Sequence, residues 1–261
     1  MSRRPSRRVR PRVRLNLFLA RAGRGSRREA DEWIREGRVQ VNGVTPEGFG
    51  EPIDPEHDRV TLDGRPVQLP EASRYLAYHK PPETLVSRRS QGGKVTIYQR
   101  LGPRAQGLHA IGRLDYDSEG LLLLTDDGTL AEAILHPRSE FLRRYRVWVT
   151  PVPDADRMRR LMAGTVIEGV AVAPDSAILE GIDRGLGLLQ IDLREGKKRE
   201  IRELAKNAGL NVRRLLRITF GPVHLGLLRS GAVRALTSAE LGALRRMAVP
   251  RGARLPRRGP R

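Results

Sequence analysis

The stretch from Gly112 to Gly128 constrains the fold more than any other part of this chain. Four leucines at 121–124 follow a glycine-bounded loop and precede a Thr-Asp-Asp-Gly turn, which is the pattern of a buried strand. Asp115 lies in the loop before that strand, with Arg113 two residues upstream. An aspartate in this place is either a turn former in a salt bridge or a reactive group held over a cleft. The residues alone leave both interpretations open.

The distribution of charge indicates a polyanionic partner. The 261 residues carry a formal net charge of +19; residues 1–13 contain six arginines and residues 250–261 five, with no acidic residue in either segment. We expect a disordered basic arm at 1–13 and a disordered basic tail at 250–261, which would contact phosphate without reading sequence. The chain between them is still basic, which favours RNA or DNA over a membrane. A surface that serves only solubility is the alternative.

The composition argues against several other classes of protein. The chain has no cysteine, which excludes disulfides and thiolate zinc sites. Its five histidines show no HxxxH or HxH spacing, so we expect no metal centre. No apolar run approaches the length of about 18 residues that a membrane helix needs, and the first residues lack a hydrophobic segment. We therefore expect a cytoplasmic protein that is neither membrane-spanning nor secreted.

Residues 14–70 have the pattern of a small α/β module. Apolar residues recur at helical spacing over 15–22, and glycines at 23–25 end that helix. Ser26 and Glu29 form a capping box for a second helix, which ends at Gly37 and carries its apolar residues on one face. Short strands are expected at 39–41, 52–53 and 59–62, the first followed by an Asn-Gly hairpin turn and the last by an Asp-Gly turn.

Residues 73–249 predict a larger domain in which strands and helices are mixed. Helices are expected at 129–136, at 154–163 with Met162 in the core, from about 200 to Gly209, and after the capping box of Thr237 and Glu240. Strands are expected at 75–79, 121–124, 141–149 and 186–193. Residues 87–106 instead look like a mobile basic loop. The fold class is therefore α+β, with a mixed, largely antiparallel central sheet flanked by helices.

A second charged stretch runs from Glu195 to Leu204. Arg199 and Arg202 are three residues apart, so both can point from one helical face toward a carboxylate or a phosphate. Tyr145 lies on the expected strand 141–149, where alternation alone favours a core tyrosine.

Three motifs resemble one known family. GRLDYDSEGLLLLTDDG closely resembles the catalytic signature of the RsuA family of ribosomal pseudouridine synthases. RYLAYHKPPETLVS and EGKKREIREL are similar to the opening strand of that catalytic domain and to its arginine-bearing motif. The resemblance covers about residues 14–249. Residues 215–225 resemble the family's closing strand and loop. This chain departs from the family pattern at His79, which we leave unassigned, and at Lys198, Glu200 and Glu203, which bear on fine substrate contacts more than on the chemistry.

The resemblance implies roles for three residues. Asp115 would be the catalytic nucleophile, Arg202 would pair with it, and Tyr145 would stack on the uracil. The reaction detaches uracil from ribose, turns it and rejoins it through carbon, so no cofactor is required. A carboxylate, a cation to keep it ionised and an aromatic face are the groups that such chemistry needs.

RLNLFLARAGRGSRREADEWIREGRVQVNG resembles the S-four-type RNA-binding domain, which often precedes this catalytic domain. Residues 14–45 carry seven basic and four acidic side chains, so the helical half of the module is the basic one. A solvated helix surface is the alternative interpretation. The candidate RNA-binding residues are Arg21, Arg24, Arg27, Arg28, Arg35, Arg38, Arg113, Lys198 and Arg199.

The sequence thus predicts an S-four-type domain at 14–70 and a pseudouridine synthase domain at 73–249. The expected function is isomerisation of specific uridines in ribosomal RNA, with the large subunit favoured because a basic C-terminal extension resembles that branch of the family. The expected partner is ribosomal RNA or a pre-ribosomal particle, and we expect a monomer. The alternative is a non-catalytic RNA-binding assembly factor on a synthase scaffold.

Overall fold

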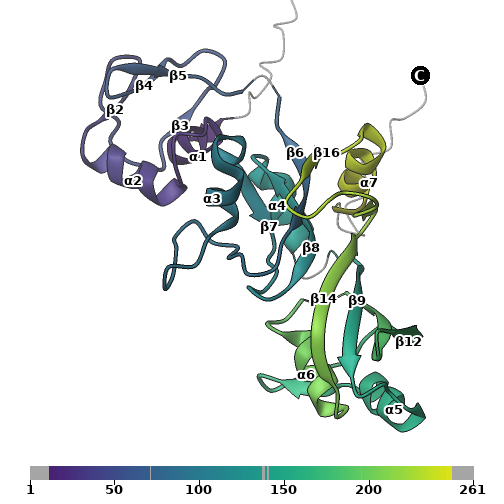
Figure 1. The fold of residues 1–261 in the computed structure, drawn as a ribbon. Coiled ribbons are helices and arrows are strands. Elements are labelled where there is room, and N and C mark those ends of the chain that lie inside the picture. The colour runs from purple at the N-terminus through teal and green to yellow at the C-terminus, as the bar shows by residue number, and fades with distance from the viewer. Residues whose placement is uncertain (1–11, 71, 137–138, 140, 195, 249–261) are drawn as a thin grey trace, which may run out of the picture. The chain divides into compact units, whose positions relative to one another are not determined.

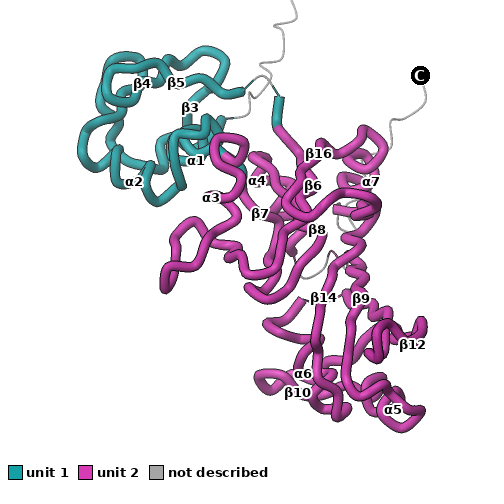
Figure 2. The backbone as a smooth tube through the Cα atoms, in the orientation of Figure 1, with its two compact units in different colours: residues 1–73, 106–108 teal, residues 74–105, 109–261 magenta. Residues whose placement is uncertain are grey.

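The computed structural model describes residues 12–70, 72–136, 139, 141–194 and 196–248. The chain divides into two compact units (Figure 2): residues 1–73 with 106–108, here called the N-terminal unit, and residues 74–105 with 109–261, the C-terminal unit. Most of the expected basic arm and the whole of the expected tail lie outside the described residues. Val13, which we had placed in the arm, belongs to a strand.

The N-terminal unit packs two short helices against small antiparallel strands. Its apolar core includes Leu15, Phe18 and Leu19 from the first helix and Ala30 and Ile34 from the second. Strands β1 and β3 pair with each other, and β2, β4 and β5 form a separate sheet in that order. The elements are β1 (Val13–Arg14), α1 (Leu15–Arg21), α2 (Arg27–Arg35), β2 (Val39–Val41), β3 (Pro52–Ile53), β4 (Val60–Leu62) and β5 (Arg65–Val67).

The local signals of this unit were predicted correctly. The Ser26 hydroxyl accepts a hydrogen bond from the Glu29 amide at 3.2 Å, and the Glu29 carboxylate accepts one from the Ser26 amide at 2.7 Å, so the capping box is confirmed. Asn42 and Gly43 both have positive φ, as the expected turn requires. Strand β2 nevertheless pairs with β4, because the chain leaves the turn after one isolated bridge between Val41 and Val44.

In the C-terminal unit, the described strands form one nine-stranded sheet and a separate hairpin of β10 and β11. Figure 1 shows β14 beside β9 in this sheet. The sheet follows the order β12-β13-β9-β14-β8-β6-β16, with β7 beside β8 and β15 beside β14. Only the β14–β8 pair is parallel among the strand pairs described, so the sheet is mixed and mostly antiparallel, as predicted. The strands are β6 (Tyr75–Lys80), β7 (His109–Ile111), β8 (Glu119–Thr125), β9 (Arg143–Thr150), β10 (Thr165–Ile167), β11 (Val170–Val172), β12 (Ser176–Asp183), β13 (Leu186–Leu193), β14 (Asn211–Phe220), β15 (Val223–His224) and β16 (Val233–Ala235).

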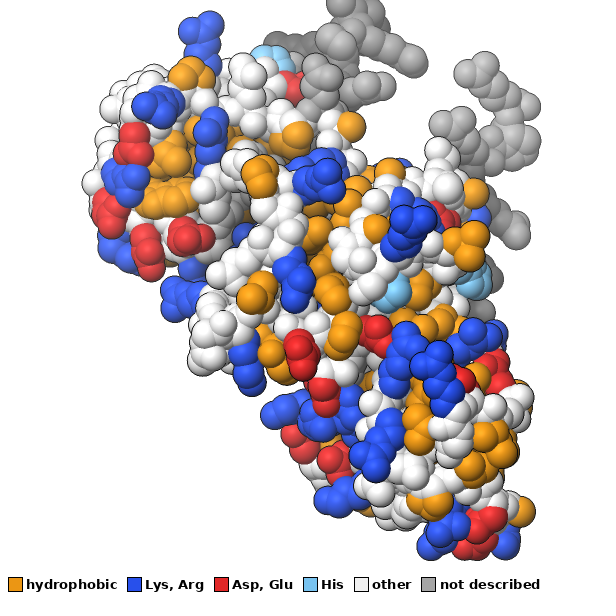
Figure 3. All heavy atoms as spheres, viewed as in Figure 1, with side chains coloured by type: hydrophobic (Ala, Val, Ile, Leu, Met, Phe, Trp, Pro, Cys, Tyr) orange, Lys and Arg blue, Asp and Glu red, His pale blue; other side chains and the backbone are white. Residues whose placement is uncertain are grey.

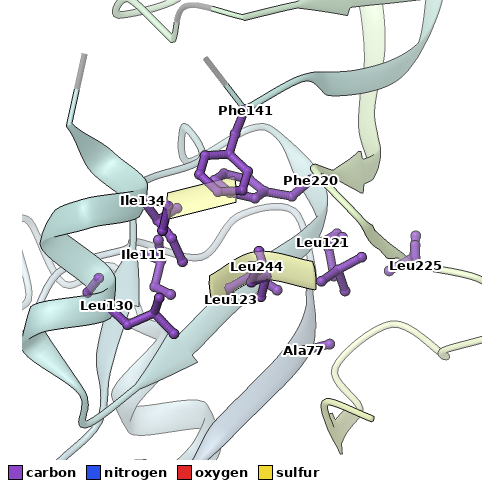
Figure 4. Close-up of a cluster of buried hydrophobic side chains, with 13 residues drawn as sticks. Ala77, Ile111, Leu121, Leu123, Leu130, Ile134, Phe141, Phe220, Leu225 and Leu244 are labelled. Atoms are coloured by element: carbon purple, nitrogen blue, oxygen red, sulfur yellow. The ribbon is translucent and has the colours of Figure 1, made fainter. Parts of the chain in front are cut away.

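The core of this unit forms around β8, whose seven residues are all buried. Leu121 and Leu123 lie in one apolar cluster with Ile134 and Leu244, while Phe141 stacks on Phe220 with ring centroids 5.9 Å apart (Figure 4). Alternation along β8 turns Leu122 and Leu124 to the opposite side of the sheet. The helices are α3 (Ile97–Leu101), the 3-10 turn η1 (Gly102–Ala105), α4 (Gly128–Leu135), α5 (Ala155–Ala163), α6 (Glu200–Asn207) and α7 (Ser238–Ala248).

Two expectations about this unit were wrong. The segment 87–106 was expected to be a loop throughout, but it contains α3 and η1. Thr96 and Gln99 form a capping box that starts α3, and Ile97 and Leu101 are buried. Met162 was expected in the core, but it is 39% exposed, because Leu161 is the residue of α5 that points inward.

Candidate active site

Asp115 lies on a tight turn between β7 and β8. The turn is closed by the Ser118 amide, which donates to the Asp115 carbonyl at 3.1 Å. Leu114 before it is buried, Asp115 itself is partly buried, and Asp117 is exposed. The turn therefore carries two carboxylates, two residues apart, at the start of the most buried strand of the unit.

Lys80, the last residue of β6, anchors this turn through its side chain. Its side chain has no exposed surface, and Nζ donates to the carbonyl oxygens of Ser118 at 2.6 Å, Pro81 at 3.0 Å and Tyr116 at 3.4 Å. Burial lowers the pKa of Lys80 to about 8, against the opposing effect of the nearby carboxylates of Asp117, Asp115 and Glu119. Our sequence analysis treated Lys80 only as the end of a strand. The available signal was a charged residue directly after buried apolar positions, because such a group needs internal acceptors.

Strand register brings Tyr145 toward the same end of β8. Gly120 pairs with Arg217 on β14, and Arg217 pairs with Tyr145 on β9. Gly120 has a φ of +108°, and a Cβ there would collide with backbone atoms of Arg217, so this position requires glycine. Tyr145 is 7% exposed and shares its face of β9 with the buried Val147 and Val149, as the alternation predicted.

Arg202 reaches the turn but contacts the other carboxylate. Its Nη2 lies 2.9 Å from the Oδ2 of Asp117 and 3.5 Å from the Asp117 carbonyl, and its Nη1 donates to the Val212 carbonyl at 3.4 Å. The expected pair with Asp115 is therefore wrong for this structure. Within the described residues, the Asp115 carboxylate has no hydrogen bond or ion pair. The spacing of Arg199 and Arg202 allowed both side chains to face a carboxylate or a phosphate. It did not show whether that carboxylate would be Asp115 or Asp117.

The start of α6 fixes both arginines. Arg199 is the N-cap, with a left-handed φ of +57°, and its Nη1 lies 3.7 Å from the Asp117 carboxylate. The Lys197 amide donates to the buried Glu200 carboxylate at 2.9 Å. An acidic residue in the first turn is favourable at the positive end of a helix. Glu200, which departs from the family pattern, thus has a structural function here.

Basic and aromatic side chains surround the turn. The Thr84 amide donates to the Tyr116 carbonyl at 3.3 Å, and the Lys94 Nζ lies 4.6 Å from the centroid of the Tyr116 ring. Lys94, in the segment that we expected to be a mobile basic loop, therefore packs against the candidate catalytic turn. The other candidates here, Arg113, Lys198 and Arg199, are exposed.

The basic candidates of the N-terminal unit differ in what they contact. Arg24, Arg27, Arg28 and Arg35 are exposed, whereas Arg21 is partly buried. Arg38 is exposed as well, but its guanidinium makes two hydrogen bonds to Asp63, of 2.8 and 2.7 Å, and one of 3.2 Å to Glu36. The Arg38 pair joins the start of β2 to the β4–β5 turn.

Two histidine environments have structural explanations. His79, which we left unassigned, lies 2.8 Å through Nδ1 from the Leu228 carbonyl and is buried. Asp54, Glu56 and His57 form the one group of potential metal ligands in the described part of the chain. The His57 ring is 3.1 Å from the Asp54 carboxylate, which also accepts the Glu56 amide, so these residues already form a hydrogen-bonded turn.

A model of the RNA pseudouridylate synthase family matches residues 74–207, which include Asp115, Tyr145 and Arg202, and an S4 domain model matches residues 13–45. The chain belongs to the RsuA family of pseudouridine synthases. It is 39% identical over 233 residues to an RNA pseudouridine synthase of Aquifex aeolicus, covering 89% of this chain and 93% of the relative.

Other relatives of this pseudouridine synthase have more specific names. The ribosomal large subunit pseudouridine synthase B of Bacillus subtilis is 33% identical over 237 residues, covering 90% of this chain and 96% of the relative. The protein of the same name from Yersinia pestis is 37% identical over 230 residues, covering 84% and 71%. A crystal structure of a pseudouridylate synthase matches with a TM-score of 0.61 at 28% identity, covering 89% of this chain and 99% of that one. None of the helices described in this synthase is long and apolar enough to cross a membrane.

Proposed function

We propose that this synthase isomerises specific uridines of ribosomal RNA in the cytoplasm, and that its target lies in the large subunit. Two relatives that align with most of this chain carry large-subunit names. We further propose that residues 14–70 bind the RNA and that residues 73–249 carry out the reaction.

Asp115 is the proposed nucleophile. The observation that carries this assignment is its place: a partly buried carboxylate, without its own ion pair among the described residues, on a turn anchored by Lys80 and flanked by Arg202. A carboxylate in a preorganised cationic surrounding can react without first breaking a salt bridge. Lys80 and Arg202 supply positive charge to the turn without occupying Asp115.

Tyr145 is the proposed platform for the uracil. A base inside RNA must leave its stack before the bond to its ribose can be reached, and an aromatic side chain can hold it once extruded. Extrusion costs a few kcal/mol, and contacts between arginine and phosphate provide binding free energy of that order. The exposed arginines of both units are the proposed source of those contacts.

The experiment is pseudouridine mapping of ribosomal RNA from cells that lack the gene, complemented with wild type or with Asp115→Asn. We expect one or a few sites to be lost on deletion and restored by wild type alone. Asp115→Asn should abolish turnover and leave RNA affinity nearly unchanged, since the carboxylate acts in the reaction and not in binding. Glu132→Gln, an exposed charge change on α4, is the control and should restore the sites fully.

Two outcomes would contradict the proposal. Restoration of the lost sites by Asp115→Asn would remove this residue from the chemistry. If no site is lost, and either version rescues a growth or ribosome-assembly defect, the protein acts as a binding factor on a synthase scaffold.

A further inference from the structure

The guanidinium of Arg202 is held on one side by Asp117. Its contacts are the Asp117 carboxylate at 2.9 Å, the Asp117 carbonyl at 3.5 Å and the Val212 carbonyl at 3.4 Å. The Arg202 side chain is 13% exposed, and its Nε has no hydrogen-bond partner among the described residues. A largely buried guanidinium of this kind depends on the one carboxylate that balances its charge.

The Asp117 carboxylate also approaches a second, solvent-exposed arginine, Arg199. Asp117 is 45% exposed, and Arg199 approaches it at 3.7 Å from the exposed N-cap position of α6. Lys198, the adjacent residue, is exposed as well. Asp117 therefore has two kinds of contact: a close one with a buried arginine and a loose one with an arginine that RNA can reach.

We propose that Asp117 is a positioning residue of this enzyme. It holds Arg202 in place beside Asp115, and it occupies the position at Arg199 that an RNA phosphate takes during catalysis. The proposal rests on the proposed function, because it assigns the phosphate to an RNA substrate.

The physical basis is the similarity of the two anions. A guanidinium binds carboxylate and phosphate with the same planar set of donors. An exposed, loose ion pair contributes little, so Arg199 can exchange Asp117 for phosphate, whereas the buried contact with Arg202 persists. The incoming phosphate then lies close to the Asp117 charge, which weakens RNA binding. Asp117 thus makes binding weaker and the reaction faster.

We therefore expect kcat and KM to change independently in Asp117→Asn. This substitution keeps the shape of the side chain and removes its charge. We expect kcat to fall about 10-fold or more, because Arg202 loses its fixed position. We expect KM for RNA to fall about threefold, because the repulsion of the phosphate is gone. Asp117→Glu restores the charge and should return KM to the wild-type value. Glu132→Gln changes the charge equally on α4 and should change neither constant.

A double-mutant cycle tests whether Asp117 acts through Arg202. In an Arg202→Lys background, Asp117→Asn should lower kcat no further. Additive losses of kcat, or a rise of KM in Asp117→Asn, would mean that the residue merely supports the turn and would overturn the proposal. Unchanged kinetic constants in Asp117→Asn would overturn it too.

A measurement on the RNA-free protein separates this proposal from the proposed function. In wild type, the guanidinium N–H groups of Arg202 should give separate, slowly rotating NMR signals, and these should average in Asp117→Asn. Binding of an oligouridine RNA, followed by fluorescence anisotropy, should be tighter in the variant. Wild type that modifies no ribosomal RNA refutes the proposed substrate, whereas unchanged Arg202 signals and unchanged RNA affinity in Asp117→Asn refute the assignment of Asp117.

Discussion

At the scale of single residues, Lys80 shows how the turn of Asp115 is held in place. Its ammonium group donates to three carbonyl oxygens and has no exposed surface. Burial of a charged amine is unfavourable, and the pKa of Lys80 falls from its ordinary 10.5 to about 8. The enzyme therefore keeps a costly buried cation where it fixes the backbone directly after its candidate nucleophile, at Tyr116 and Ser118.

Lys80 predicts a particular pH dependence of stability. Above pH 8 the folded protein releases a proton from Lys80 that the unfolded chain keeps until about pH 10.5, so the free energy of unfolding rises with pH in that window, by up to about 3 kcal/mol from this group. Urea unfolding between pH 7 and 10 should show this rise in wild type and not in Lys80→Met.

The same pH dependence in wild type and Lys80→Met would contradict the prediction. If that variant does not fold, direct NMR titration of the Lys80 Nζ in wild type replaces it, and a midpoint near 10.5 would refute the assignment.

The residue that carries the positive charge at the site was predictable, but its partner was not. The family resemblance marked Arg202 as a site residue, and the spacing of Arg199 and Arg202 allowed both to face a carboxylate or a phosphate. Whether Arg202 pairs with Asp115 or with Asp117 depends on how α6 packs against the turn. Arg202 and Asp117 are 85 residues apart in sequence, so this packing is not a local property. The role of Lys80 was missed because the three carbonyl groups that surround it come together only in the fold. The sequence shows no more than a charged residue directly after apolar positions.

At the scale of elements, the parallel pair of β8 and β14 determines how the site is aligned. Gly120 lets the backbone of Arg217 approach closely, and this register sets Tyr145 on β9 relative to the catalytic turn. This alignment therefore requires glycine at position 120, because any Cβ there would separate the two strands.

Gly120→Ala should separate these two strands. The new Cβ would overlap backbone atoms of Arg217, and its φ of +108° is strained for alanine, so we expect a loss of about 3 kcal/mol or more and little activity. Thermal unfolding measures the effect. Gly128→Ala, at the first residue of α4 where a Cβ meets nothing, is the control and should be neutral or slightly stabilising. Equal stability of the two variants would contradict this account of the register.

Elements were predictable where their cause is local. Ser26 with Glu29 and Thr237 with Glu240 each mark a helix start, and both capping boxes are present. The helix at Thr96 carries the same signal, but the basic, glycine-containing residues before it suggested a loop. Strand β12 was missed because it is an edge strand with exposed Ile178 and Ile182, so it lacks the burial contrast on which strand prediction depends.

At the scale of the whole molecule, much of the positive charge is balanced within the fold. On the face seen in Figure 3, Lys and Arg side chains of the C-terminal unit are interspersed with Asp and Glu. Cross-strand pairs such as Arg144 with Asp192 at 2.7 Å and Arg146 with Glu180 at 3.1 Å belong to this pattern. The net charge of +19 therefore does not by itself locate an RNA-binding surface.

The arginines at the start of α2 provide a test of where RNA binds. Arg27 and Arg28 are exposed and have no ion pair in the described part of the chain. We expect Arg27→Glu with Arg28→Glu to weaken RNA binding and to reduce the slope of log affinity against log salt by about 1 for each lost phosphate contact. Arg184→Glu, in the exposed β12–β13 turn, is the control for charge alone and should have a smaller effect than Arg28→Glu by itself, which changes the charge equally. An equal effect of the control would place the contacts outside α2.

The order of strands in the sheet also determines when the two halves of the candidate active site can be joined during synthesis. Strand β14 lies between β8 and β9, both of which precede it in the chain. While a ribosome is still translating, β8 and β9 can leave the exit tunnel and pair with their sequence neighbours, but the gap between them stays open until β14 emerges. Arg217, which links Gly120 to Tyr145 by register, lies on β14, so this link is absent until then. A nascent chain therefore carries both halves of the candidate active site without joining them until β14 has been synthesised.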